Sequence, residues 1–259
     1  MRMLARPVEA FGRFLTELFE ELGQWFIILG AFFSRLLFPP YRFRLIFEQM
    51  EFVGVQSLGI VALTGLFVGM VFAVQLAIGL GMMGAEGLVG STTALALTRE
   101  VGPMLTALMV TGRAGSAMAA TIGTMKVTEQ IDALEAMAVD PIDYLVVPRI
   151  IATTLMLPLL TMVFNTVGIL GAWYFAKTVV GIDDGMFWGR FDWYLDPDDI
   201  SDGLIKSAIF GFMLAWIGCS KGMSTKGGAQ GVGITTTKAV VYASVTILVS
   251  DYFITRLLY

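Results

Sequence analysis

Residues 52–85 read FVGVQSLGIVALTGLFVGMVFAVQLAIGLGMMGA, and this stretch decides the fold class. It contains no charged side chain, and neither does the stretch from Ile150 to Ala176. An apolar run of about 18 or more residues without charges is long enough to cross a bilayer as a helix. Only 15% of the chain is charged, whereas a soluble domain carries about a quarter charged residues. The sequence therefore predicts an all-α integral membrane protein.

The apolar runs predict about five transmembrane helices. The first run is longer than the about 20 residues of one upright crossing, and it is rich in glycine. It predicts one long or bent helix over about 54–80 and then a turn rich in Gly and Met; a re-entrant hairpin is the alternative. Gly65 and Gly69 have the spacing that lets two membrane helices approach closely. The other spans are expected over about 90–118, 149–175, 203–220 and 239–258.

The N-terminal region predicts a different kind of helix. From Val8 to Leu37 the apolar residues recur at helical spacing, with charged residues largely on the opposite side. This pattern is typical of an amphipathic helix that lies in the membrane interface; a soluble helix packed on a partner is the alternative. Pro39-Pro40 ends it. We therefore expect an interfacial helix and connector over residues 1–50 and a transmembrane domain over 51–259.

The basic residues predict the orientation, because cytoplasmic loops of membrane proteins carry an excess of Lys and Arg. With the N-terminus inside, 12 of the 17 basic residues are cytoplasmic, and the C-terminus is outside. The cytoplasmic set is Arg2, Arg6, Arg13, Arg35, Arg42, Arg44, Arg113, Lys126, Arg149, Lys221, Lys226 and Lys238. The last three are expected in a glycine-rich loop between the fourth and fifth spans, and an acidic loop with seven aspartates lies outside.

Several absences narrow the chemistry. The chain has no histidine and one cysteine, Cys219, so we expect no metal site, no disulfide and no Ser–His–Asp triad. It also lacks the G-x-x-x-x-G-K-[ST] phosphate loop. We expect no catalytic activity, and any uphill transport must be driven by an ion gradient or a separate ATPase.

Four ionisable residues fall within or at the edge of predicted spans: Arg99, Glu100, Lys206 and Asp251. A charge at the bilayer centre costs at least about 2.5–3.5 kcal/mol, so such groups are usually paired or face a cavity. We expect Glu100 to pair with Lys206 and Arg99 with Asp251, in a cluster that gates a cavity or meets a lipid headgroup. Interface charges that reach up to the headgroups are the alternative.

Residues 112–141 carry the most specific pattern. Small residues from Gly112 to Gly123 predict tight packing at the end of the second span. The following amphipathic segment over 126–140 is acidic and predicts a docking element for the groove of a soluble partner. An ordinary amphipathic loop is the alternative from periodicity alone.

Together with several other motifs, this segment resembles the MlaE/YrbE family, the permease subunits of ABC transporters that work with MCE-domain proteins in phospholipid trafficking across Gram-negative envelopes. The further motifs are Gly65–Met70, Leu97–Pro103, Val147-Pro148-Arg149, Leu157–Thr161, Gly181-Ile182-Asp183 and Leu204–Ser207. The resemblance covers nearly everything from about residue 50 to the end. The sequence departs from the family at Glu48, where better-known members carry an arginine shortly before the first span, so no headgroup role is transferred there.

The resemblance implies a homodimer in the bacterial inner membrane, with the N-terminus cytoplasmic and the C-terminus periplasmic. A cytoplasmic ABC ATPase dimer would bind ATP and Mg²⁺, while this chain would bind no cofactor and no nucleic acid. The coupling residues would be Glu129, Gln130, Ile131, Asp132, Leu134, Glu135, Asp140 and Pro141. The outer halves of three spans would enclose a phospholipid beneath a periplasmic MCE hexamer, with lipid-cavity candidates Val68, Val71, Val74, Gln75, Ala77 and Ile78.

The expected function is thus phospholipid transport that maintains outer-membrane asymmetry. Two other classes remain open. A secondary transporter would use Glu100 or Asp251 as a proton relay and need no ATPase. A structural scaffold of an envelope complex would tolerate loss of the charged cluster without loss of transport.

Overall fold

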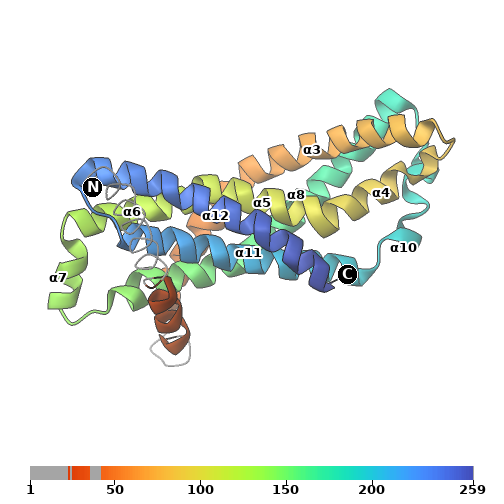
Figure 1. Cartoon of the computed structure of the whole chain (residues 1–259). Coiled ribbons are helices and arrows are strands. Elements are labelled where there is room, and N and C mark those ends of the chain that lie inside the picture. Colours follow the sequence, from red (N-terminus) through yellow and green to blue (C-terminus); the bar gives the residue numbers. More distant parts are fainter. Residues whose placement is uncertain (1–22, 24, 36–41, 259) are drawn as a thin grey trace, which may run out of the picture.

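The computed structural model describes residues 23, 25–35 and 42–258, which form an elongated bundle of helices (Figure 1). Within these ranges there is no β-strand, as the predicted all-α class requires. Most of the interfacial helix predicted over Val8–Leu37 lies outside the described residues. Its described part is the helix Trp25–Arg35, which crosses the bundle on one side (Figure 1).

The first predicted span is one long helical stretch. Helix α2 (Phe43–Met50), the π-helical segment η1 (Glu51–Val55) and α3 (Gln56–Gly81) follow one another without a break over 39 residues. The long-helix prediction is confirmed and the re-entrant hairpin is wrong. The helical stretch also runs through residue 50, where the connector was expected to end. The predicted turn follows, with Gly84 in the left-handed region at φ +69°.

The remaining long helical stretches alternate in direction along the bundle, and the short helices lie at its ends (Figure 1). The second stretch consists of η2 (Glu86–Leu88), α4 (Val89–Ala96), η3 (Leu97–Val101), α5 (Gly102–Val110), η4 (Thr111–Gly115) and α6 (Ser116–Val127). Next come α7 (Gln130–Ala136), η5 (Ile142–Val146), α8 (Val147–Phe175) and η6 (Ala176–Val180). The chain ends with α9 (Asp184–Trp188), α10 (Phe191–Tyr194), α11 (Pro197–Met223) and α12 (Gly228–Leu258). We call the two ends of the bundle the α7 end and the α10 end.

Four helical stretches in the described part of the chain are long and apolar enough to cross a membrane: Phe43–Gly81, Ile142–Val180, Pro197–Met223 and Gly228–Leu258. The stretch from α4 to α6 also runs from the α10 end to the α7 end (Figure 1). Its charged side chains, Arg99, Glu100, Arg113 and Lys126, make it less apolar than the other four.

The glycine-rich basic loop is much shorter than predicted. Lys221 belongs to α11 and Lys238 to α12, and only residues 224–227 connect the two helices. Glycine has a low helix propensity, but packing overrides it here. A Cβ at Gly231 would lie 1.8 Å from the carbonyl oxygen of Lys226, so the close fit of the chain at this point requires glycine.

Helices α3 and α8 lie against each other through glycine (Figure 1). A Cβ at Gly69 would be 1.9 Å from the carbonyl oxygen of Gly168, and one at Gly65 would be 2.7 Å from that of Phe164. Small residues let helix backbones approach closely and gain van der Waals contact in a membrane. The GxxxG prediction therefore identified a real helix–helix contact.

This contact yields a prediction with an internal control. We expect Gly69→Ala to lower stability by about 1–3 kcal/mol, because the added methyl group must push α3 away from α8. Gly59 lies on the same helix with nothing within 4 Å of a built Cβ, so Gly59→Ala should cause no loss. Thermal unfolding of both variants in detergent micelles checks the difference, and equal melting temperatures would contradict the packing argument.

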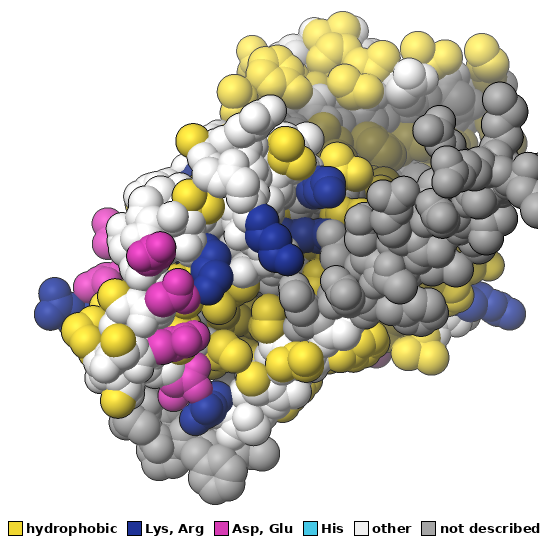
Figure 2. Space-filling model, turned by 60° about the vertical axis from the view of Figure 1, so that its left-hand side comes forward, with side chains coloured by type: hydrophobic (Ala, Val, Ile, Leu, Met, Phe, Trp, Pro, Cys, Tyr) yellow, Lys and Arg dark blue, Asp and Glu magenta, His cyan; other side chains and the backbone are white. Residues whose placement is uncertain are grey.

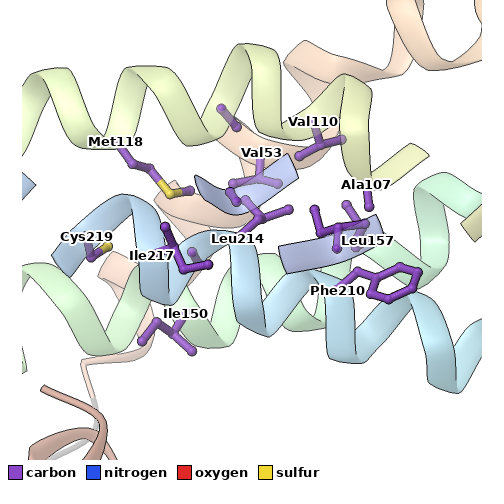
Figure 3. Packing of buried hydrophobic residues seen from close by; sticks show 14 of the residues in the cluster. Val53, Ala107, Val110, Met118, Ile150, Leu157, Phe210, Leu214, Ile217 and Cys219 are labelled. Atoms are coloured by element: carbon purple, nitrogen blue, oxygen red, sulfur yellow. The ribbon is translucent and has the colours of Figure 1, made fainter. Parts of the chain in front are cut away.

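The core fills the space between these helices at the α7 half of the bundle (Figure 3). Val53, Met118, Ile150 and Ile217 come from four different helical stretches and are each at most 1% exposed. A second, smaller cluster around Ala73, Ala172 and Phe187 lies towards the α10 end. Buried apolar side chains thus hold the helices together in both halves of the bundle.

Candidate functional site

An ionic cluster lies between η3, α11 and α12, and Lys206 is its centre. The Lys206 side chain is 1% exposed, and its Nζ donates to Glu100 Oε2 at 2.6 Å and to Thr255 Oγ1 at 2.7 Å. Asp251 Oδ1 lies 3.1 Å from the same Nζ, near enough for an ion pair but not aligned for a hydrogen bond. Lys206 Nζ also reaches the carbonyl oxygen of Arg99 at 3.2 Å.

The expected pairing of Glu100 with Lys206 is therefore present, but the expected pairing of Arg99 with Asp251 is not. Arg99 donates through Nε to Asp199 Oδ1 at 2.6 Å, and the Asp199 side chain is 5% exposed. Asp199 also accepts from the backbone N–H of Asp196 in the capping box that begins α11. Because Asp251 pairs with Lys206, Arg99 pairs instead with Asp199 at the beginning of α11.

The cluster combines two cations, Arg99 and Lys206, with three carboxylates, Glu100, Asp199 and Asp251. Lys206 is completely enclosed, while Glu100 keeps 38% of its side chain exposed and Asp251 keeps 17%. A buried ammonium requires such partners, because an unpaired charge in this environment is strongly unfavourable. The cluster ties three helical stretches together and leaves carboxylate surface accessible.

The segment predicted to dock a partner stands at one extreme end of the molecule (Figure 1). Figure 2 shows Asp and Glu side chains gathered at the edge where α7 lies, with Lys and Arg side chains beside them. Glu129, Gln130, Asp132 and Glu135 are exposed. Asp132 accepts from Lys126 Nζ at 2.8 Å, which orients the start of α7.

The apolar residues of the segment face the other way. Ile131 is 1% exposed and belongs to the core cluster, with Leu134 packed against it. These two side chains hold α7 on the bundle and are not available to a partner in this structure. The large apolar side chain that is exposed in this segment is Met137, at 64% exposure. Sequence periodicity identified the apolar face of α7 but not what it packs against.

Left-handed backbone marks both ends of α7. Glu129 has φ +60° and Ala138 has φ +59°, and such conformations cost non-glycine residues on the order of 1–2 kcal/mol each. Strain of this kind concentrates at functional sites and persists only where the surroundings enforce it. The geometry of the turn that presents α7 is therefore well defined.

The end of the segment is held internally. Asp140 forms an ion pair with Arg35 and accepts from the N–H of Ile142 at 2.8 Å, while Pro141 is buried. Arg35 also lies 3.9 Å from Asp143. Asp140 thus connects the helix Trp25–Arg35 to the segment that follows α7.

The lipid-cavity candidates divide by face of α3. Val71, Gln75 and Ile78 are exposed and share one side of the helix at positions i, i+4 and i+7. Val74 is half-buried, Val68 packs on the core, and Ala77 is buried against α8 within the smaller cluster. An acyl chain could reach the first three directly in the single chain.

The α10 end carries an acidic and aromatic loop. Asp184 accepts from Lys177 Nζ at 2.6 Å and from Trp173 Nε1 at 2.8 Å. These two hydrogen bonds hold the pKa of the Asp184 carboxyl group below its ordinary value. Its charge therefore persists as the pH falls, and the loop keeps its tie to the end of α8. Trp193 beyond it is 89% exposed.

Sequence reasoning did not predict the side-chain contacts of three residues, two in the ionic cluster and one outside it. Thr255 bridges Lys206 and Glu100, and Asp199 holds Arg99. Arg113 donates to the carbonyl oxygen of Phe52 at 2.6 and 2.9 Å, which ties η4 to η1. Thr255 lies four residues after Asp251 on α12, a helical spacing that could have placed it in the cluster. Within the described ranges, no three His, Cys, Asp or Glu side chains come together as a metal site.

The long apolar helices, joined by an enclosed ionic cluster, define a multi-pass membrane protein. The family model described as Permease MlaE matches residues 46–257. The chain belongs to the MlaE permease family.

Curated relatives agree over nearly the whole chain. A probable ABC transporter permease protein of Rickettsia bellii is 38% identical over 257 residues, which cover 99% of both chains. The intermembrane phospholipid transport system permease protein MlaE of Haemophilus influenzae is 37% identical over 264 residues, again 99% of both. The chloroplastic protein TRIGALACTOSYLDIACYLGLYCEROL 1 of Arabidopsis thaliana is 42% identical over 226 residues, 87% of this chain and 65% of that protein. The chain is thus a membrane permease of a family with a role in lipid transport.

Proposed function

We propose that this chain is the transmembrane subunit of an ABC transporter that moves phospholipids between the inner membrane and a periplasmic MCE protein, and so maintains outer-membrane lipid asymmetry. The observation that carries the proposal is the full-length match to a permease of an intermembrane phospholipid transport system. The chain would bind no nucleotide and would act as a homodimer, with the N-terminus cytoplasmic and the C-terminus periplasmic.

A separate cytoplasmic ATPase dimer, which binds ATP and Mg²⁺, would dock on α7. The exposed acidic side chains Glu129, Asp132 and Glu135 support this role, because they offer a partner with a basic groove a complementary surface. The inward-facing Ile131 supports it as well, since it makes α7 move with the bundle rather than independently.

The ionic cluster would respond to a displacement of α7. The stretch from α4 to α6 runs along the whole bundle, with α7 following its last residues and Glu100 nearer its other end. Displacement of α7 would therefore be transmitted to the contact of Glu100 with Lys206 and to α12. The exposed carboxylate surface of Glu100 and Asp251 would meet the lipid headgroup when the cavity beneath the MCE hexamer opens.

The proposal is tested by pulling down the tagged chain from native membranes and identifying the copurifying proteins and lipids by mass spectrometry. An ABC ATPase, an MCE-domain protein and phospholipid are expected together. A secondary transporter would give another result: the purified chain alone, in vesicles with a pH gradient, would move phospholipid without ATP. That outcome, with no ATPase in the pull-down, would overturn the proposal.

A further inference from the structure

A buried arginine lies beside a cavity between the first, second and third helical stretches at the α7 end. Arg149, near the start of α8, is 9% exposed. Its Nη1 donates to the carbonyl oxygen of Leu145 at 2.6 Å, and no ion pair with a described residue compensates its charge. A guanidinium group has five N–H donors and stays charged at all physiological pH values. Burying it with one acceptor leaves most of its donors and its whole charge unmatched.

The cavity next to this side chain has a volume of about 220 Å³. Its walls are Gln49 and Phe52 from α2 and η1, Ala117, Met118 and Thr121 from α6, and Arg149 from α8. This volume is several times the about 30 Å³ that one water molecule occupies in the liquid. The cavity can therefore hold a polyatomic group rather than a single solvent molecule.

The polar groups around the cavity are suited to an anion. The side-chain amide of Gln49 has no protein partner among the described residues, and it can donate two hydrogen bonds. Thr121 is exposed, so the cavity is accessible beside it. The nearby carboxylate of Glu48 pairs with Arg44 at 3.1 Å, and Glu51 is exposed. A guanidinium group and an amide that line the same cavity favour phosphate, which arginine binds through two parallel hydrogen bonds.

We propose that this cavity binds the phosphate group of a phospholipid at the α7 end of the bundle. Two features indicate that the phosphate group belongs to a lipid rather than to a free ion. Phe43 and Phe47 of the adjoining helix α2 are 63% and 67% exposed, as expected for a helix that inserts aromatic rings into a membrane interface. Val55, one turn beyond Phe52, is 65% exposed and would meet an acyl chain. The cavity lies at the end opposite to the acidic loop of α9 and α10, and it is separate from the ionic cluster.

The site also has a structural consequence. Leu145, which accepts from Arg149, belongs to η5, the segment that joins the docking helix α7 to α8. A bound phosphate neutralises Arg149 and should stabilise this junction by binding the folded state. The site requires neither an ATPase nor transport, so it can be tested independently of the proposed function.

The test titrates the full chain in detergent with short-chain phosphatidylglycerol, with the diacylglycerol of the same acyl chains, and with inorganic phosphate. Binding is followed by native mass spectrometry and by the shift in melting temperature. We expect the phospholipid to bind and the diacylglycerol, which lacks phosphate, not to bind at this site. If inorganic phosphate binds with the same affinity as the phospholipid, the cavity is a phosphate site that does not require a lipid, and the lipid part of the proposal is wrong.

Three variants assign the binding to this cavity. We expect Arg149→Gln to weaken phospholipid binding by about tenfold or more, as loss of a charged hydrogen-bonding partner does. Gln49→Leu changes a partly exposed residue that also lines the cavity; it should weaken binding too, and it keeps the test informative if Arg149→Gln does not fold. Lys226→Gln removes an exposed cation from the same end that does not line the cavity and should leave binding unchanged. Equal binding by all variants, or equal binding of diacylglycerol, would overturn the proposal.

Discussion

Charge reversal of Glu129 and Asp132, as Glu129→Lys with Asp132→Lys, is expected to abolish copurification of an ATPase with this chain. Glu129 directly precedes α7, Asp132 lies on it, and both side chains are exposed, so the substitutions change the charge of the proposed docking element without disturbing the core. Like charges brought together across an interface cost several kcal/mol, enough to reduce binding at least about a hundredfold. Affinity purification of the tagged chain, with quantification of the copurified ATPase, measures the effect.

A matched control separates docking from overall charge. Asp198 is exposed at the α10 end, and Asp198→Lys with Asp183→Lys reverses two charges far from α7. This variant should retain the ATPase. Melting temperatures of both double variants verify that the chain remains folded. If the ATPase copurifies equally with the α7 variant, α7 is not the docking element and the driving partner engages another surface.

The second large effect is expected at the centre of the ionic cluster. Lys206→Met should destabilise the chain by about 3 kcal/mol, because it leaves Glu100 and Asp251 without their shared cation. It also removes the donor to Thr255 Oγ1. A lowered melting temperature in detergent and a loss of phospholipid transport by the reconstituted complex are the readouts.

Two comparisons make this prediction specific. Neutralising Lys206 and its two carboxylate partners, with Lys206→Met, Glu100→Gln and Asp251→Asn together, should recover most of the stability, since no unpaired charge remains. Lys177→Met breaks an ion pair whose two side chains are about half exposed, and it should cost at most about 1 kcal/mol. If the triple variant recovers stability but not transport, the charged residues are needed for transport itself and not only for folding. Unchanged stability of Lys206→Met would contradict the central role of Lys206.

The parts of the fold that were predictable depend on local composition. A long charge-free run predicts a spanning helix wherever it occurs, because the hydrocarbon core excludes charge and requires satisfied backbone groups. The glycines at 65 and 69 predicted a close helix–helix contact for a similarly local reason, namely that they leave one face of α3 without side chains, and the structure shows that the partner is α8. The pairing of Glu100 with Lys206 followed from the high cost of isolated charges in spans.

The site was less predictable, because charged residues can exchange partners. The sequence reasoning assigned Asp251 to Arg99 and did not consider Asp199, because only the positions of α11 and α12 decide which pairs form. Likewise, Ile131 could have faced a partner protein or the chain itself; the turn with Glu129 at positive φ directs it inward.

Residues 52–85 by themselves determined that this is a membrane protein whose first hydrophobic segment is longer than one upright crossing, because hydropathy and length depend on no other part of the chain. Its path could not be read from them. Two of the glycines that allowed a re-entrant hairpin, Gly65 and Gly69, instead face carbonyl oxygens of α8, and contact between the two helices keeps α3 continuous. Tertiary structure alone likewise decided that Arg149, in sequence one of many cytoplasmic cations, is buried beside a cavity. Burial, ion pairing and cavities depend on residues brought together from distant parts of the chain.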